Sequence, residues 1–185
     1  MNRKINQIKK LVKSECVANG LGWFYDCHLL AVEKFAQELL EKLPEADKEI
    51  VMLGVWLHDL QRVRGIKGDH AKIGASEAEK VLEQFKYSQE TIARVEEIIL
   101  AHSCDTRLMP KTREGKILAS ADAMSHYIND FYLTIAATGQ RDAASFKKWA
   151  REKLERDYHK KIFFGFARKM VAKRHKILKE FFAME

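Results

Sequence analysis

The chain is poor in proline, glycine and cysteine, and each shortage narrows the class of protein. Its 185 residues include 2 prolines and 9 glycines, which leaves few signals that break secondary structure and favours long helices. Three cysteines, Cys16, Cys27 and Cys104, stand far apart. An odd number at such wide spacing is not a disulfide framework. We therefore expect a protein whose thiols stay reduced, as they do in the cytoplasm.

Long hydrophobic runs are also missing. The longest apolar run extends from Ile50 to Leu57, which is far shorter than the roughly 20 residues that a membrane-spanning helix needs. The N-terminus begins Met-Asn-Arg-Lys and lacks the apolar region of a signal peptide. We therefore expect a soluble cytoplasmic protein with neither a membrane segment nor a secretion signal.

Charged side chains are plentiful, and the positive ones are concentrated at one end. The net charge is +7, yet residues 1–146 carry 20 Lys and Arg against 21 Asp and Glu, whereas residues 147–185 carry 13 against 5. The basic segment also contains apolar residues at roughly helical spacing, namely Phe163, Phe166, Met170, Ile177, Leu178 and Phe181. We interpret it as amphipathic helices packed on the core, with nucleic-acid binding as a less favoured alternative.

Apolar residues recur with helical periodicity along the whole chain, and no strand-like alternation competes with them. Asp47 and Ser88 are typical helix N-caps, and Asp69 or Ser76 would begin the helix between them. The sequence predicts an all-α, single-domain bundle of about seven or eight helices. The predicted helices cover about 2–16, 25–43, 47–60, 69–85, 88–102, 112–138, 143–158 and 161–182.

The dipeptide His58-Asp59 ends the most apolar of these helices. His58 follows Val51 and Val55 on the face that should be buried. A histidine and an aspartate in such a place cost free energy unless something pairs with them. A metal ion would satisfy both side chains at once.

Other histidines and one aspartate show the same inward placement. His28 lies on the apolar stripe of its helix, His102 ends a helix, and His70 begins one. Asp122 is the single acidic residue of an apolar helical segment, and His126 follows it by one turn. Each histidine alone is more often a hydrogen-bonded core residue, but the joint pattern favours a site for a divalent ion such as Mn, Fe, Co, Ni, Zn or Mg.

This set resembles the HD superfamily of metal-dependent phosphohydrolases, in which a histidine precedes an adjacent His-Asp pair and a distant aspartate. Here these would be His28, His58-Asp59 and Asp122. The resemblance spans about residues 22–130, and its local matches are 55–60 (VWLHDL), 98–103 (IILAHS) and 114–123 (EGKILASADA). It implies an HD core at about 22–138, with the basic helices 143–183 packed on it.

The resemblance also implies a ligand set and a chemistry. Some HD proteins bind one metal and others bind two, and the second kind has two further histidines, for which His70 and His102 stand at suitable positions. Asp59 would then bridge the two ions. The implied reaction is the hydrolysis of a small phosphorylated molecule, such as a nucleotide, by metal-activated water.

A cationic side chain should hold the substrate phosphate. Arg62 is the first candidate, with Asp59 as the central catalytic residue; a related HD subgroup often has lysine at this position, so the arginine is a departure. Lys72 and Arg113 are weaker candidates. Two alternatives stay open: an HD-fold di-iron oxygenase with the same ligands, and a degenerate HD domain that binds nucleic acid. The oligomeric state is not indicated by the sequence.

Overall fold

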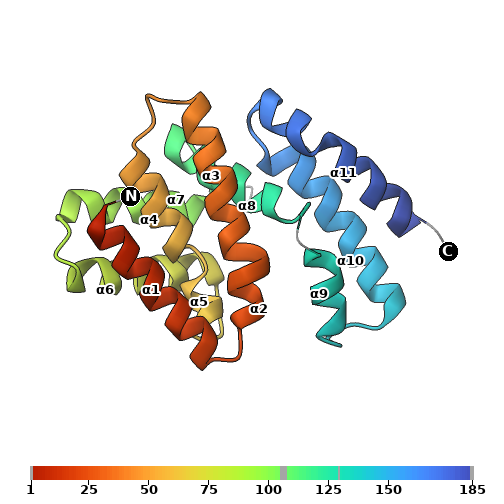
Figure 1. The fold of residues 1–185 in the computed structure, drawn as a ribbon, viewed down its shortest axis with the longest axis horizontal. Helices are drawn as coiled ribbons and strands as arrows, with labels where there is room; N and C mark the ends of the chain where they lie inside the picture. The colour runs from red at the N-terminus through yellow and green to blue at the C-terminus, as the bar shows by residue number, and fades with distance from the viewer. Residues whose placement is uncertain (1, 105–107, 129, 184–185) are drawn as a thin grey trace.

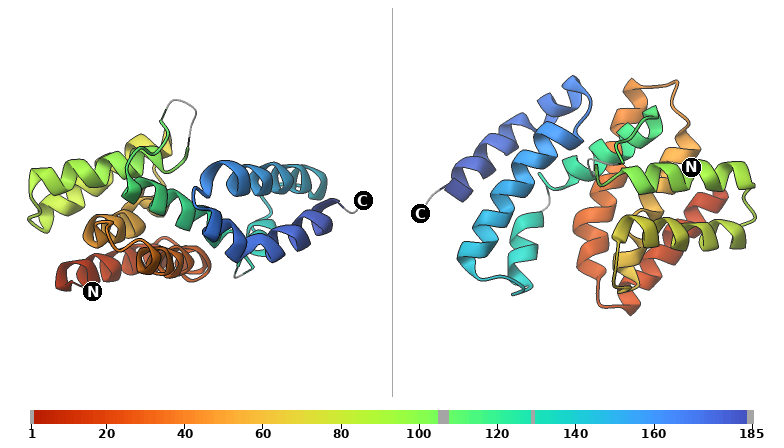
Figure 2. Two further views of the ribbon diagram at one scale, coloured as in Figure 1. Left: turned by 90° about the horizontal axis from the view of Figure 1, so that it is seen from above. Right: turned by 180° about the vertical axis from the view of Figure 1, so that it is seen from behind.

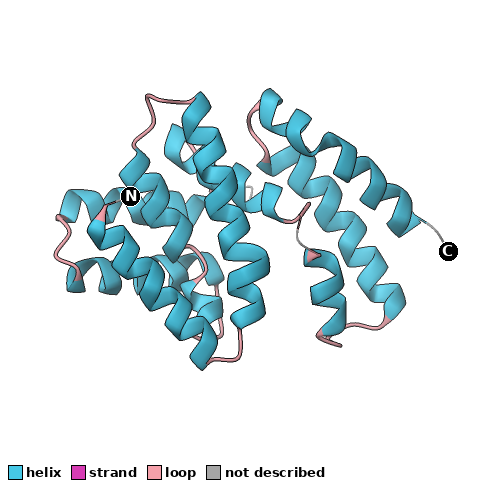
Figure 3. Cartoon of the chain, in the orientation of Figure 1, coloured by secondary structure: helices cyan, strands magenta, loops and turns pink. Residues whose placement is uncertain are grey.

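The computed structural model describes residues 2–104, 108–128 and 130–183, which fold into helices joined by short loops (Figure 3). No β-strand occurs in these ranges, so the all-α prediction is confirmed. The predicted loop before residue 112 lies partly outside the described residues. The helices are α1 (Arg3–Ala18), α2 (Gly22–Phe24), α3 (Leu30–Lys42), α4 (Lys48–Leu57), α5 (Leu60–Val63), α6 (His70–Gln84), α7 (Gln89–Ala101), α8 (Arg113–Ser125), α9 (Phe131–Ala137), α10 (Ala143–Arg156) and α11 (Gly165–Ala183), with π-helical turns η1 (Tyr25–Leu29) and η2 (Asp157–Lys161).

Polar side chains cap the free backbone amides at the start of several helices. Asp47 caps α4 and Ser88 caps α7, as the sequence predicts. Of the two candidates for the start of α6, Asp69 is the cap, because its carboxylate accepts hydrogen bonds from the N–H groups of Ala71 and Lys72. Each such cap stabilises its helix by about 1 kcal/mol.

Helix α4 is the centre of the fold. All residues from Ile50 to Leu57 are buried, and α4 contacts α1, α3, α6, α7 and α8. A helix that is apolar on every side is stable only when it is surrounded, which explains the uninterrupted hydrophobic run. Figure 1 shows α1 to α7 gathered on one side of α8, and α9 to α11 on the other. Across the described ranges, none of the helices combines the length and hydrophobicity that a membrane span requires.

The basic C-terminal helices form a second layer beside α8. Helix α10 packs against α11, and both η2 and α11 contact α8 (Figure 2). The buried face of α11 differs from the predicted one: Ala167 and Val171 are buried, whereas Ile177 and Phe181 are 53% and 49% exposed. The buried stripe of α11 runs through Ala167, Val171 and Phe182, and of the predicted residues Phe166 and Leu178 pack partly against the core.

The single helix predicted for 112–138 is wrong, because the chain breaks there into α8 and α9. Helix α8 ends at Ser125, and α9 begins at Phe131. Asp130 has φ of 55°, a left-handed conformation that a continuous helix does not tolerate but that aspartate adopts more readily than most residues. The break turns the chain immediately after His126 and brings α9 to the edge of the pocket described below.

Gly74 lets α6 approach the end of α4 closely. A Cβ atom at this position would lie 2.9 Å from the backbone oxygen of His58. We predict that Gly74→Ala lowers the free energy of unfolding by about 1–3 kcal/mol through overpacking, and displaces His58. Thermal unfolding measures the effect. The control variant is Gly22→Ala, because an added methyl group there meets no atom within 4 Å. Equal unfolding midpoints for the two variants would contradict the prediction.

Candidate metal centre

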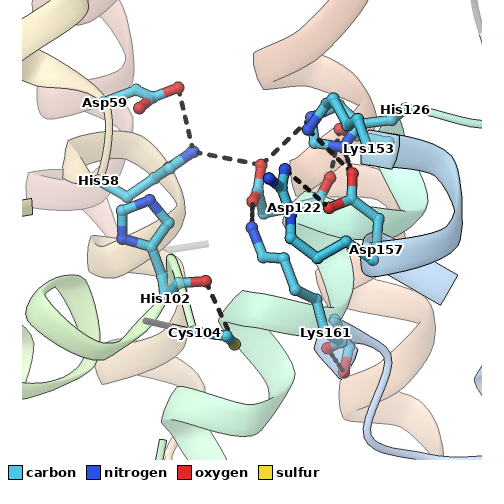
Figure 4. A network of polar contacts seen from close by, with 12 residues as sticks. His58, Asp59, His102, Cys104, Asp122, His126, Lys153, Asp157 and Lys161 are labelled. Atoms are coloured by element: carbon cyan, nitrogen blue, oxygen red, sulfur yellow. Dashed lines mark hydrogen bonds and ion pairs between the residues drawn. The ribbon is translucent and has the colours of Figure 1, made fainter. Parts of the chain in front are cut away.

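Three histidines and two aspartates from distant parts of the chain meet beside the end of α4. His28 lies in η1, His58 ends α4, Asp59 joins α4 to α5, His102 ends α7, and Asp122 lies within α8. None of the five is more than 8% exposed. Figure 4 shows His58, Asp59, His102 and Asp122 gathered in one space. The structure thus brings together five of the six residues that the sequence indicates as metal ligands.

The backbone fixes which ring nitrogen of two histidines faces this space. Nδ1 of His58 lies 3.0 Å from the carbonyl oxygen of Val55, and Nδ1 of His102 makes the same contact with the carbonyl of Ile99. A carbonyl oxygen only accepts hydrogen bonds, so Nδ1 carries the proton in both rings. When such a ring is neutral, Nε2 keeps its lone pair and is the atom that binds a metal.

A serine sets the same tautomer, with the proton on Nδ1, in the ring of His28. The hydroxyl of Ser125 donates to the carbonyl of Asp122 at 2.7 Å, and the same oxygen lies 2.9 Å from Nδ1 of His28. Because its one proton is already donated, the Ser125 oxygen accepts from Nδ1–H of His28. Nε2 of His28 is therefore the unprotonated nitrogen. All three histidines direct the same kind of donor atom into the centre.

The atoms that face one another are spaced as ligands around an ion are. Nε2 of His28 is 3.5 Å from Oδ2 of Asp59 and 3.5 Å from Oδ1 of Asp122, and Nε2 of His58 is 3.6 Å from Oδ2 of Asp59. Both Nε2 atoms are buried and have no hydrogen-bond partner among the described residues. Ligand atoms bound at about 2.0–2.2 Å to a common ion have such separations. The donors present therefore fit a divalent metal.

The ligand atoms form two overlapping sets, each within 4.8 Å. One set is His28, His58 and Asp122, and the other is His58, Asp59 and His102. His70, the sixth predicted ligand, belongs to neither set. It is exposed at the start of α6, but its ring centroid lies 5.3 Å from that of His102, and it lines the same pocket.

The protonation of these groups suits metal binding. Burial lowers the pKa of His28, and it lowers the pKa of His102 to about 3, so both rings are neutral at neutral pH. Burial alone would raise the pKa of Asp59, but His58 and Arg62 outweigh it, and the pKa lies well below its usual value. Neutral imidazoles and ionised carboxylates are the forms that bind metals.

Lys161 is a member of the site that sequence reasoning missed. Its side chain is buried in η2, and Nζ lies 2.5 Å from Oδ2 of Asp122. Burial disfavours the charged amine, but Asp122 and Asp157 raise the pKa of Lys161 above its usual value. Oδ2 of Asp122 is thus held by Lys161, while Oδ1 faces His28 at 3.5 Å. The only sequence signal was the excess of positive charge after residue 146.

A second buried network supports the outer side of Asp122. Asp157 is completely buried, and its Oδ2 lies 2.8 Å from Nδ1 of His126 and 2.9 Å from Nζ of Lys153. Nε2 of His126 in turn lies 3.6 Å from Oδ1 of Asp122. Figure 4 shows this chain of contacts running from η2 and α10 to Asp122. The C-terminal helices therefore position the last aspartate.

The centre opens into a pocket with a strongly cationic wall. The cavity has a volume of about 270 Å³, and the positively charged side chains that line it are Arg62, Lys153, Arg156 and Lys161. Arg62 is exposed and lies with its guanidinium 5.2 Å from the centre of the Phe24 ring. The two weaker phosphate-binding candidates do not line this pocket: Lys72 pairs with Asp69, and Arg113 pairs with Glu45.

Comparisons with known proteins identify a family and two relatives of this chain. The sequence model of the HD domain family matches residues 25–126, a range that contains all six predicted ligands. The 3'-5' exoribonuclease YhaM of Shouchella clausii (strain KSM-K16) is 24% identical over an alignment of 119 residues that covers 55% of this chain and 37% of that enzyme. The chain thus spans little more than a third of the length of this relative.

A solved structure shares the fold. It is the crystal structure of a predicted HD superfamily hydrolase from an uncultured Thermotogales bacterium, at 22% identity and a TM-score of 0.64. The alignment covers 95% of this chain and 87% of that one, so the shared fold includes the C-terminal helices as well as the helices before them. The family model covers more than half of the sequence, and this chain belongs to the HD domain family.

Proposed function

We propose that the protein is a metal-dependent phosphohydrolase that acts on a small phosphorylated molecule, such as a nucleotide. The observation that carries the proposal is the convergence of three imidazole Nε2 atoms and two ionised carboxylates in a pocket lined by four cationic side chains. Donors of this kind suit first-row divalent ions, and the cations suit an anionic substrate.

His28, His58, Asp59 and Asp122 would hold one divalent ion, and Asp59, His102 and His70 would hold a second. Ions bound there would supply Lewis acidity, lowering the pKa of a water and offsetting negative charge on the phosphoryl oxygens. The protein's own contribution is to orient the donors. Val55, Ile99 and Ser125 fix the ring tautomers, and Lys161 fixes the carboxylate of Asp122.

The cationic wall would bind and orient the phosphate. Lys161 and Lys153 are already paired with Asp122 and Asp157. Arg156 lies 3.4 Å from Asp157 but is 52% exposed, and Arg62 is exposed at the pocket rim. These two guanidinium groups are therefore the ones free to turn towards a substrate, and each can bind a phosphate through two parallel hydrogen bonds.

Arg62→Ala tests this assignment separately from the metal. We predict that the variant keeps its metal content, while KM for a phosphomonoester rises about tenfold or more, because one charge-assisted contact is worth about 1.5–3 kcal/mol. Steady-state kinetics with p-nitrophenyl phosphate and nucleoside monophosphates measures the effect, with exposed Lys67→Ala as the matched control. An unchanged KM and kcat would remove Arg62 from the mechanism.

RNA is a second candidate substrate, because the matched relative is named as a 3'-5' exoribonuclease. The cavity volume of about 270 Å³ lies just below the range of about 300–1,000 Å³ for ligand pockets, which favours a small substrate. An assay with a nucleoside monophosphate and a 5'-labelled single-stranded RNA separates the two. Release of inorganic phosphate supports the first proposal, and stepwise shortening of the RNA from its 3' end supports the second.

A further inference from the structure

A second group of metal-binding side chains lies on the C-terminal helices, outside the pocket. Glu155 belongs to the last turn of α10, His159 lies in η2, and His175 lies in the middle of α11. One ligand atom from each side chain falls within 4.8 Å of the other two. None of the three lies within the residues matched by the family model. Figures 1 and 2 show that α10 and α11 run side by side, so the group joins two neighbouring helices.

The distances within this group fit an ion. Oε2 of Glu155 lies 3.4 Å from Nε2 of His159, and Oε1 lies 3.2 Å from Nε2 of His175. Neighbouring ligand atoms of a tetrahedral zinc site with bonds of about 2.0–2.1 Å are about 3.3–3.4 Å apart. The two distances here go to different oxygens of Glu155, and a single one of its oxygens lies within 4.8 Å of the donor atoms of both histidines. A carboxylate and two imidazoles would leave one position for water.

One of these atoms also lacks the hydrogen bond that a buried polar atom normally makes. Nε2 of His175 is inaccessible and has no hydrogen bond among the described residues, although it faces Oε1 of Glu155 at 3.2 Å. The same pattern marks Nε2 of His28 and His58 in the centre described above. Buried polar atoms without a hydrogen bond are uncommon and require an explanation. An ion shared with Glu155 would satisfy Nε2 of His175.

The surroundings hold the histidine and leave the site accessible. The ring of Tyr158 stacks on that of His175, with centroids 4.0 Å apart and planes 14° apart, which restricts the rotation of the imidazole. The side chain of His159 is 60% exposed, so an ion can enter from solvent.

One cation competes for this place. Nζ of Lys179 lies 3.1 Å from Oε1 of Glu155, but its side chain is 59% exposed. A flexible, mostly hydrated lysine can turn into the solvent when an ion arrives, because an exposed ion pair contributes little. We propose that Glu155, His159 and His175 form a second metal site, separate from the HD centre, which takes a divalent ion such as zinc and joins α11 to α10.

Zinc titration of the metal-free full-length protein tests the proposal, with isothermal calorimetry to count equivalents. We expect His159→Ala to remove one equivalent or weaken it about a hundredfold, because one of three protein ligands is lost. Lys160→Ala, a change at an exposed neighbour in η2, should leave the titration unchanged. Lys179→Met should tighten this equivalent about fivefold, because it removes the competing charge.

The Lys179 variant distinguishes a metal site from a structural ion pair. If Glu155 and Lys179 serve only to join the helices, Lys179→Met destabilises the protein and does not affect zinc binding. Zinc stoichiometry and affinity that are the same in wild type, His159→Ala and Lys179→Met would overturn the proposal. Asp59→Ala should keep the Glu155 equivalent, so the outcome is independent of whether the HD centre binds metal.

Discussion

Replacing Asp59 with alanine should abolish metal binding at the HD centre and reduce kcat/KM by at least about 1,000-fold, or about 4 kcal/mol. The carboxylate lies 3.5 Å from Nε2 of His28 and 3.6 Å from Nε2 of His58, so its loss removes the group that both donors share. The substitution Asp59→Asn, which keeps the shape of the side chain but removes its charge, should have nearly the same effect. Metal analysis and phosphatase assays measure the two effects together.

Asp142→Ala is a suitable control, because Asp142 caps α10 and does not line the pocket. It removes an aspartate and weakens one helix, yet it should keep both the metal and the activity. The account is contradicted if Asp59→Ala retains wild-type activity. It is also contradicted if Asp142→Ala and Asp59→Ala lose activity to the same extent, since the loss would then reflect general stability.

Lys161→Met should cause a large loss of stability in the metal-free protein. Removing one member of a buried ion pair leaves the other charge uncompensated, which costs about 3–5 kcal/mol; for a chain of this length that lowers the melting temperature by about 6–20 °C. Lys161 is 5% exposed and Asp122 is also 5% exposed, with their charged atoms 2.5 Å apart. Thermal unfolding with a chelator present measures the loss.

Two further variants show whether the loss comes from the orphaned carboxylate. Lys161→Met combined with Asp122→Asn should recover much of the stability, because no unpaired charge remains. Lys160→Met, which changes the exposed neighbour, should unfold as the wild type does. Divalent metal should also stabilise Lys161→Met more than it stabilises the wild type, provided that the ion contacts Asp122. A double variant no more stable than Lys161→Met would exclude this coupling.

The parts of the site that could be predicted are those that local sequence places. His58 and Asp59 are adjacent at the end of an apolar helix, so their joint burial follows from helical periodicity alone. Asp122 is an isolated acid in an apolar segment, and its burial at 5% exposure agrees with that pattern. The helix starts at Asp47 and Ser88 were predictable for the same reason, because a cap depends only on the next few residues.

The parts that could not be predicted depend on long-range packing. Lys161 reaches Asp122 across 39 residues, and this contact requires the chain to reverse after α8. That reversal begins near Asp130, whose left-handed backbone is not encoded by the apolar periodicity. The same reversal carries Lys153 and Arg156 to the pocket. From the sequence alone, these residues were indistinguishable from the solvated face of a basic helix.

The most direct test of the metal centre is elemental analysis of the His159→Ala variant, purified without chelator. The variant is used so that metal bound at the proposed site on α10 and α11 does not add to the count. We predict about one or two equivalents of a divalent transition metal, and fewer than about 0.1 equivalents when Asp59→Ala is added to the same variant. The absence of metal, even after incubation with manganese, iron, cobalt, nickel or zinc salts, would contradict the account.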